Sequence, residues 1–203
     1  MVSFFTFNKA NASFPLAGKI FVIDAGHGGV DPGTVVGNIY EKDINLQISL
    51  ALKNEIIRLG GTVYMTREGD YDLGTPQATY RKKSDFDHRI SFINNSKADY
   101  YISIHLNYLS DSRYSGVQLF YTDTLKENKI IASKIQDYLN NALKTNREIK
   151  KISNTIYMYS KLKIPGVLIE CGFLSNAKER ELLQDEKYIK KFVENLAQSF
   201  VKI

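Results

Sequence analysis

Segments with the apolar pattern of β-strands alternate along this chain with segments that have the periodicity of α-helices. Strands are predicted at 19–24, 62–66, 100–105, 117–121, 156–159 and 167–170. Helices are predicted at 41–59, from 84 onward, across 131–142 and across 178–201. This alternation predicts the α/β class: a twisted, mostly parallel (mixed) sheet of about six strands with helices on both faces.

The longest loop is predicted at 67–83, a polar stretch that contains glycine and proline. Ser84 with Asp87 has the spacing of a helix N-terminus. The apolar positions of that helix predict its buried face at Phe86, Ile90 and Ile93. His88 falls within the same helix, where we expect a solvated or packed residue.

The 203 residues contain no internal repeat, low-complexity tract or linker, so one domain is predicted at 19–203. Residues 1–18 are predicted to be an N-terminal tail or the remnant of an export signal. The sequence Ala10-Asn11-Ala12 matches the small-x-small pattern of a signal-peptidase site, but the apolar part before it is shorter than an export signal needs. Both interpretations stay open.

Composition excludes several classes of function. The formal charge is +5, yet lysine and arginine are spread along the chain without a nucleic-acid-binding motif, so no nucleic acid partner is predicted. Cys171 is the one cysteine, which excludes an intrachain disulfide. No apolar run approaches the ~18 residues of a membrane-spanning helix.

A glycine-rich turn, VIDAGHGGVDPG, follows the first predicted strand at 22–33. Its glycines do not have the G-x-G-x-x-G register of a dinucleotide site. The carboxylates of Asp24 and Asp31 would also repel a phosphate group. A nucleotide site is therefore a poor interpretation of this turn, and His27 needs another explanation.

Four polar residues stand at or just past strand ends, or at a helix start: His27, His105, Glu170 and Glu41. Each alone has an ordinary structural interpretation, such as a turn residue, a strand-end histidine, a helix N-terminal carboxylate or half of an ion pair. Together they converge on the edge of the sheet where α/β proteins bind ligands. Two imidazoles and one carboxylate form the ligand set of a catalytic zinc site, and a second carboxylate has the chemistry of a general base.

Five segments, in this order, resemble the zinc N-acetylmuramoyl-L-alanine amidases: DAGHGGVDPG, YEKDINL, YMTRE, SIHLN and VLIECGFLSN. The resemblance extends from Lys19 to the C-terminus. It implies Zn²⁺ ligands at His27, Glu41 and His105, and a catalytic glutamate at Glu170. It also implies peptidoglycan as the substrate, cleaved at the amide between the lactyl group of N-acetylmuramic acid and L-alanine.

Asp24 and Asn107 flank the two histidines in sequence. We expect them either to orient the imidazoles by hydrogen bonds or to serve only as buried turn residues. Cys171 follows Glu170 on a predicted strand, so its side chain should point to the opposite face as a buried, inert thiol.

Within the family, the KDINL segment, the 67–83 loop and the compact length most resemble the spore-cortex amidases of endospore-forming bacteria. That resemblance implies cortex maturation through muramic δ-lactam formation, outside the cytoplasm in the cell wall or the forespore-cortex space. Wall-binding repeats are lacking, and 106–116 is too short for a blocking helix. We therefore expect an activating or localising partner protein.

Two other functions fit parts of the pattern. A zinc carboxypeptidase on stem peptides would use a similar ligand set and a cation for the terminal carboxylate, which Arg67, Arg81 or Arg89 could supply. A non-catalytic wall-binding or regulatory module is the other alternative. The complete set of three ligands and a fourth acidic residue argues against it.

Overall fold

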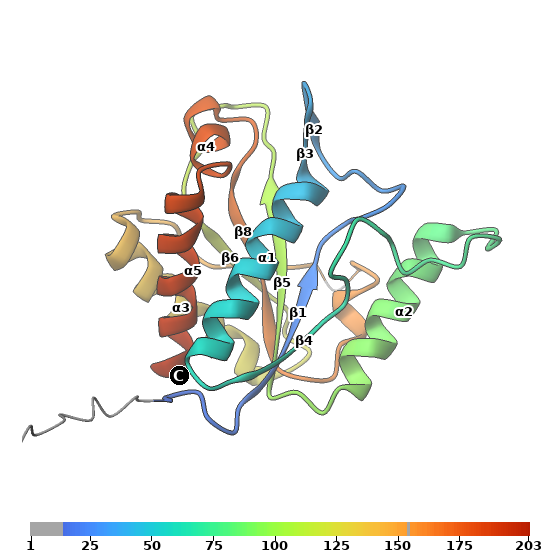
Figure 1. The fold of residues 1–203 in the computed structure, drawn as a ribbon, viewed down its shortest axis with the longest axis horizontal. Helices are drawn as coiled ribbons and strands as arrows, with labels where there is room; N and C mark the ends of the chain where they lie inside the picture. The colour runs from blue at the N-terminus through green and yellow to red at the C-terminus, as the bar shows by residue number, and fades with distance from the viewer. Residues whose placement is uncertain (1–13, 154) are drawn as a thin grey trace, which may run out of the picture.

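A six-stranded sheet runs through the centre of the molecule in the computed structural model, which describes residues 14–153 and 155–203 (Figure 1). Its order is β4-β1-β5-β8-β6-β7. The strands are β1 (Ile20–Ala25), β4 (Thr62–Met65), β5 (Tyr100–Asn107), β6 (Gln118–Tyr121), β7 (Lys150–Lys151) and β8 (Gly166–Phe173). Neighbouring strands are parallel except β6 and β8. The predicted mostly parallel sheet is confirmed.

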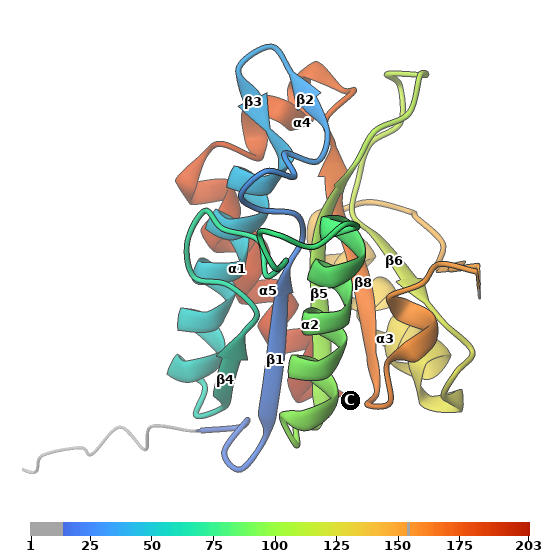
Figure 2. The same ribbon diagram turned by 90° about the vertical axis from the view of Figure 1, so that its right-hand side faces the viewer.

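Helices cover both faces of this sheet. On one face, α1 (Glu41–Arg58), α3 (Lys126–Leu143) and α5 (Glu186–Val201) pack over the larger apolar core. On the other face, α2 (Arg81–Asn95) and a short 3-10 helix, η1 (Tyr159–Lys161), cover a smaller core. Figure 2 shows α2 in front of the sheet and α5 behind it. Successive strand residues serve opposite faces: Phe21 and Ile23 enter the larger core, and Val22 enters the smaller one.

The strand predicted at 156–159 is wrong. This segment forms a turn that leads into η1, and β7 is the edge strand instead. Met158 and Tyr159 are adjacent and both buried in the smaller core, together with Leu162. Burial of two consecutive side chains and a third close by suits a helical turn, because a strand would direct neighbours to opposite faces.

The second helix begins at Arg81, three residues before the predicted start at Ser84. The Ser84 hydroxyl does not cap the helix; it accepts a hydrogen bond from the Thr75 backbone N–H at 3.0 Å and so fastens the preceding loop. Ile93 is buried as predicted, but the most buried companions on that face are Asp85 and Arg89. These charged side chains point inward because Arg89 forms ion pairs with Asp85 and with the buried Asp24 of β1.

The C-terminal helix predicted at 178–201 is divided into α4 (Ala177–Leu182) and α5. The Asp185 side chain accepts a hydrogen bond from the Tyr188 backbone N–H at 2.9 Å, which caps the first turn of α5. This break lets Leu183 enter the larger core with 1% of its surface exposed.

A small antiparallel hairpin, β2 (Val35–Val36) with β3 (Ile39–Tyr40), stands at the top of Figure 2 and leads directly into α1. The sequence did not predict it. The Ala10-Asn11-Ala12 segment lies outside the described residues. Within the described part of the chain, no helix is both long and apolar enough to cross a membrane.

Candidate metal centre

Three side chains from separate segments converge beyond the carboxyl ends of β1 and β5. His27 Nε2 lies 3.1 Å from Glu41 Oε1, and His105 Nδ1 lies 3.2 Å from the same oxygen. One donor atom from each residue falls within 4.8 Å of the others. Among residues 14–153 and 155–203, this is the one such group of histidine, cysteine or acidic side chains. The predicted convergence of these three residues is therefore observed.

The glycine-rich turn allows this convergence by close packing. A Cβ on Gly26 would lie 2.3 Å from His105 Cε1, and a Cβ on Gly33 would lie 2.7 Å from both Glu41 Oε2 and His27 Cδ2. His27 itself adopts φ 62°, in the left-handed region that few residues other than glycine occupy. Arg89 stabilises that conformation by donating to the His27 carbonyl oxygen at 2.7 Å. Because Gly26 and Gly33 have no side chain, His27, Glu41 and His105 can pack directly against the backbone of the turn.

His27 is oriented by Asp31, a residue that the sequence analysis considered only as a repulsive charge. His27 Nδ1 lies 2.8 Å from Asp31 Oδ2. Because the ionised carboxylate only accepts, Nδ1 carries the proton and Nε2 is directed at Glu41. Lys82 forms an ion pair with the same carboxylate. In the sequence, this contact could have been inferred from the four-residue spacing of His27 and Asp31 within a tight turn.

Glu41 is the first residue of α1 and only 3% exposed. Its carboxylate accepts backbone hydrogen bonds from Thr34 at 2.9 Å and from Leu106 at 3.2 Å. Burial alone raises the pKa of Glu41, but hydrogen bonds and charges from His105 and His27 hold it well below its usual range. The carboxylate is therefore ionised at neutral pH.

The electrostatics of this site favour a cation. Burial lowers the pKa of His27, but the Asp31 and Glu41 carboxylates outweigh burial and raise that pKa to about 9. Surroundings that favour a proton on this imidazole also favour a metal ion in its place. Two imidazole nitrogens and one carboxylate oxygen are borderline ligands of the kind that zinc takes.

Glu170 stands beside this cluster, on the strand next to the one that carries His105. It faces His105 across the β5–β8 pairing, and its Oε2 atom is buried without a hydrogen bond among the described residues. Burial, together with the negative charge of Glu41, raises the pKa of Glu170 to about 8. A buried carboxyl group with such a pKa can both take up and release a proton near neutral pH.

The two flanking residues do not contact the histidines directly. Asp24 is buried and accepts hydrogen bonds from Thr66, Arg89 and Ser103. Asn107 offers its backbone carbonyl to the Leu174 N–H at 2.8 Å. Of the two alternatives for these residues, Asp24 is thus a buried residue that has no direct hydrogen bond to an imidazole among the described residues.

Cys171 and His88 lie where the sequence predicted. Cys171 is buried in the larger core, on the sheet face opposite Glu170's side chain, and burial raises the pKa of its thiol well above the usual value. His88 is exposed on α2, with Nδ1 2.6 Å from the Leu73 carbonyl oxygen.

The three arginines considered for a terminal carboxylate are already engaged. Arg67 donates to four backbone carbonyl oxygens. Arg81 pairs with Asp72 at 2.9 Å, and Arg89 pairs with Asp24 at 2.7 Å. None of the three arginines that the carboxypeptidase interpretation named is therefore free of a partner.

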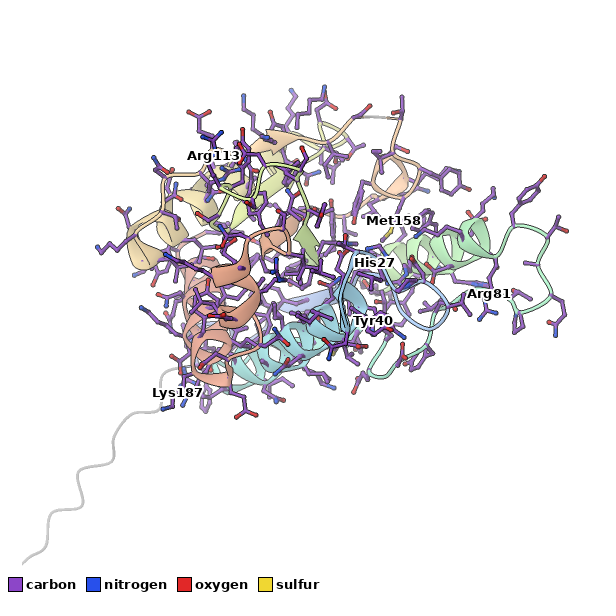
Figure 3. The ribbon with its side chains drawn as sticks, turned by 90° about the horizontal axis from the view of Figure 1, so that it is seen from above. His27, Tyr40, Arg81, Arg113, Met158 and Lys187 are labelled. Carbon is purple, nitrogen blue, oxygen red and sulfur yellow. The ribbon has the colours of Figure 1, made fainter. Side chains whose placement is uncertain are left out.

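A pocket of about 250 Å³ opens beside the cluster. Its lining extends from His27 and His105 to apolar side chains that include Phe86, Met158 and Leu168. Seen from above, His27 and Met158 lie close together near the middle of the molecule, while Arg113 lies apart from them (Figure 3). The pocket gives a substrate access to the cluster from the α2 side.

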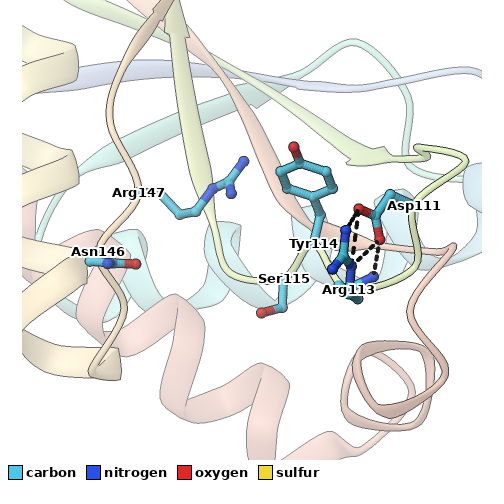
Figure 4. A pocket seen from close by; sticks show the side chains of 6 residues that line it. All are labelled: Asp111, Arg113, Tyr114, Ser115, Asn146 and Arg147. Carbon is cyan, nitrogen blue, oxygen red and sulfur yellow. Dashed lines mark hydrogen bonds and ion pairs between the residues drawn. The ribbon is translucent and has the colours of Figure 1, made fainter.

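A larger pocket of about 400 Å³ lies at the loops around Arg113 and Arg147 (Figure 4). Arg113 is turned toward Asp111, with which it forms an ion pair of 2.8 Å, and Arg147 comes from a separate segment. The Arg147 guanidinium stacks over the rings of Tyr114 and Phe173. No member of the histidine–glutamate cluster lines this pocket, so we assign no chemistry to it.

Comparison with known proteins identifies one family and several similar proteins. The profile of the family described as N-acetylmuramoyl-L-alanine amidase matches residues 21–202. The germination-specific N-acetylmuramoyl-L-alanine amidase of Bacillus subtilis (strain 168) is 41% identical over 194 residues, which cover 94% of this chain and 81% of that protein.

Two solved structures have the same fold. The CwlD amidase from Clostridioides difficile, in complex with the GerS lipoprotein, is 40% identical with a TM-score of 0.85; the match covers 91% of this chain and 97% of that one. An N-acetylmuramoyl-L-alanine amidase from Clostridium difficile 630 is 29% identical with a TM-score of 0.79, covering 92% and 96%.

Proposed function

The chain belongs to the N-acetylmuramoyl-L-alanine amidase family, and we propose that it is a zinc-dependent hydrolase of peptidoglycan. The bond cleaved is the amide between the lactyl group of N-acetylmuramic acid and the L-alanine of the stem peptide. The single observation that carries the proposal is the convergence of His27, Glu41 and His105 beside Glu170, whose Oε2 atom is buried without a hydrogen bond among the described residues.

In this proposal His27 Nε2, Glu41 Oε1 and His105 Nδ1 hold Zn²⁺. These are the atoms that face one another. When bound, zinc supplies Lewis acidity, which polarises a carbonyl and makes water nucleophilic at neutral pH. Through the hydrogen bond to Nδ1, Asp31 would orient the imidazole so that Nε2 is the nitrogen that binds the metal.

Glu170 moves the protons of the reaction. Its carboxylate takes a proton from the water that attacks the lactyl carbonyl carbon, so that a C–O bond forms. It then gives that proton to the nitrogen of L-alanine as the C–N bond breaks, because an amine leaves readily only when protonated. The products are a free lactyl carboxylate on the glycan and a peptide with a free N-terminal L-alanine. A pKa raised to about 8 by burial suits both steps.

We further propose that this activity serves the spore cortex. Two similar proteins, the germination-specific amidase of Bacillus subtilis and the CwlD amidase, support this role. Removal of the peptide would give the precursor of muramic δ-lactam. The enzyme would then act outside the cytoplasm. Its catalytic domain would comprise 19–203, with Leu16 of the preceding segment packed into the larger core.

A partner protein is part of this proposal. CwlD was solved with a lipoprotein bound, which supports an activating or localising partner for this chain as well. Because metal binding and ordering of the site are coupled, a partner that increases zinc affinity would activate the enzyme.

The test is to incubate purified peptidoglycan with the protein and zinc, and to identify the products by mass spectrometry. Peptides with a free N-terminal L-alanine and glycan strands without peptide are expected, and a chelator should abolish both. Release of single amino acids from the peptide C-terminus would instead identify a carboxypeptidase. Absence of products in the presence of bound zinc would favour a non-catalytic module.

A further inference from the structure

Tyr159 links the second histidine of the metal centre to the interior of the protein. It begins η1, is 7% exposed, and lies in the smaller core. Its hydroxyl oxygen is 3.3 Å from His105 Nε2 and 3.0 Å from the Ser103 hydroxyl. Its position in the sequence predicts a strand residue and no role in the site.

The contacts continue from Ser103 to Asp24. The Ser103 hydroxyl lies 2.7 Å from Asp24 Oδ2. On its other oxygen, Asp24 accepts from Arg89 at 2.7 Å and from Thr66 at 2.9 Å. Asp24 is therefore the fixed end of a chain of hydrogen bonds that reaches His105 through two hydroxyl groups.

The direction of each hydrogen bond in this chain follows from its Asp24 end. Burial raises the pKa of Asp24, but Arg89 and the Ser103 hydroxyl outweigh burial and lower it, so the carboxylate is ionised and only accepts. Ser103 must then donate to Asp24 and accept from Tyr159. The Tyr159 hydroxyl thus accepts from His105 Nε2, so that Nδ1, the nitrogen that faces Glu41, is the one available to a metal ion.

We propose that Tyr159 is a positioning residue: with Ser103 it relays the Asp24 carboxylate to His105, and so holds that imidazole in the tautomer and orientation that bind the metal. This inference rests on the proposed zinc-dependent function. It gives each histidine ligand its own carboxylate, since Asp31 contacts His27 directly and Asp24 reaches His105 through Ser103 and Tyr159.

Tyr159 is buried in the smaller core, so its hydroxyl group is held beside both His105 and Ser103. Partners of this kind around a metal ligand are typically worth about 10–100-fold in metal affinity or activity.

The first test is the zinc affinity of a Tyr159→Phe variant, measured by competition with a chromophoric chelator. Phenylalanine keeps the buried ring and removes only the hydroxyl, so the expected result is affinity weakened about 10–100-fold. Tyr157→Phe is the matched control, because the Tyr157 hydroxyl donates to Asp87 at 2.5 Å, outside the relay. That variant should bind zinc like the wild type.

A second measurement observes His105 itself. The sequence has three histidines, so a spectrum of the zinc-bound protein labelled with ¹⁵N-histidine contains few signals, and His88→Ala identifies one of them. In the wild type, the proton on His105 Nε2 should exchange slowly with water. In Tyr159→Phe it should exchange faster, because its acceptor is gone.

Thermal unfolding of the metal-free protein shows whether Tyr159→Phe folds. If it does not, Ser103→Ala is the variant in which zinc affinity is measured. It deprives Tyr159 of its acceptor and should weaken zinc binding in the same direction. Wild-type zinc affinity and wild-type proton exchange in the folded variants would overturn the inference. A wild type that binds zinc but releases no peptide from peptidoglycan would overturn the proposed reaction and leave the relay intact.

Discussion

The Nδ1 atom of His27 lies 2.8 Å from the Oδ2 atom of Asp31, four residues further along the same turn. This contact decides which nitrogen of His27 faces the metal centre. It also gives a role to Asp31, whose negative charge would be unfavourable in a glycine-rich turn that bound a phosphate group. The glycines bring the backbone close to His105, and the aspartate orients the one imidazole that the turn supplies.

Replacement of Asp31 by asparagine is expected to weaken zinc binding about 10–100-fold. Asparagine keeps an oxygen for the Gly33 N–H but removes the charge that stabilises a proton on Nδ1. Zinc affinity measured by chelator competition checks this. Asp111→Asn is the control, since Asp111 forms an ion pair with the exposed Arg113 and lies outside the cluster. Equal affinities in the two variants would refute the role of Asp31.

Replacement of His27 or His105 by alanine is expected to abolish stoichiometric zinc binding and amidase activity. The physical reason is the loss of one of three ligands, which a water molecule replaces poorly. His88→Ala is the matched control, because His88 is exposed on α2 and outside the cluster. The zinc content of the purified variants, measured by mass spectrometry, tests this prediction. Full zinc occupancy in both ligand variants would exclude the proposed site.

Replacement of Glu170 by glutamine is expected to leave zinc bound and to lower the amidase rate about 10²–10⁴-fold, the usual contribution of a general acid–base group. Glutamine is close in size but does not accept and return a proton. Glu68→Gln, which alters an exposed ion pair with Lys53, should keep the wild-type rate. Zinc content and peptide release are measured on the same samples. If Glu170→Gln loses its zinc, Glu170 is a ligand and not the base.

Stability is expected to depend on Asp24 in acid. Burial raises the pKa of Asp24, but the charge of Arg89 and the Ser103 hydrogen bond outweigh it and leave the folded-state pKa below the usual 3.8. The pair with Arg89 therefore stabilises the fold fully above that value, and the stabilisation is lost as the pH falls through the lowered pKa.

Urea unfolding of metal-free protein over a pH series measures this effect. At pH 7, Asp24→Asn should reduce the free energy of unfolding by about 3–5 kcal/mol, because it leaves a buried guanidinium without one of its carboxylates. Below the usual pKa the difference from wild type should shrink. Asp87→Asn, which alters an exposed pair with Lys83, should change the free energy by about 0.5 kcal/mol or less. A constant difference at all pH values would contradict the argument.

Local pattern was sufficient for much of the fold. The apolar spacing from Glu41 onward predicted α1 nearly to its end, and the runs that follow Lys19 and Asp99 predicted β1 and β5. The apolar pattern gave wrong predictions in two places: the turn before η1 and the buried face of α2. Residues 156–159 have the composition of a strand but bury adjacent side chains in a helical turn, and α2 buries Asp85 and Arg89.

The sequence by itself determined which residues meet at the metal centre, because parallel strands carry whatever follows them to one edge of the sheet. The tertiary structure alone decided what surrounds them. Ser103 and Tyr159 are 56 positions apart, and Asp24 and Arg89 are 65 apart. Such contacts depend on how a loop and a helix pack over the sheet, and periodicity reports only neighbours within a few residues. The three residues that converge could therefore be predicted from the sequence, but most of the residues that hydrogen-bond to them could not.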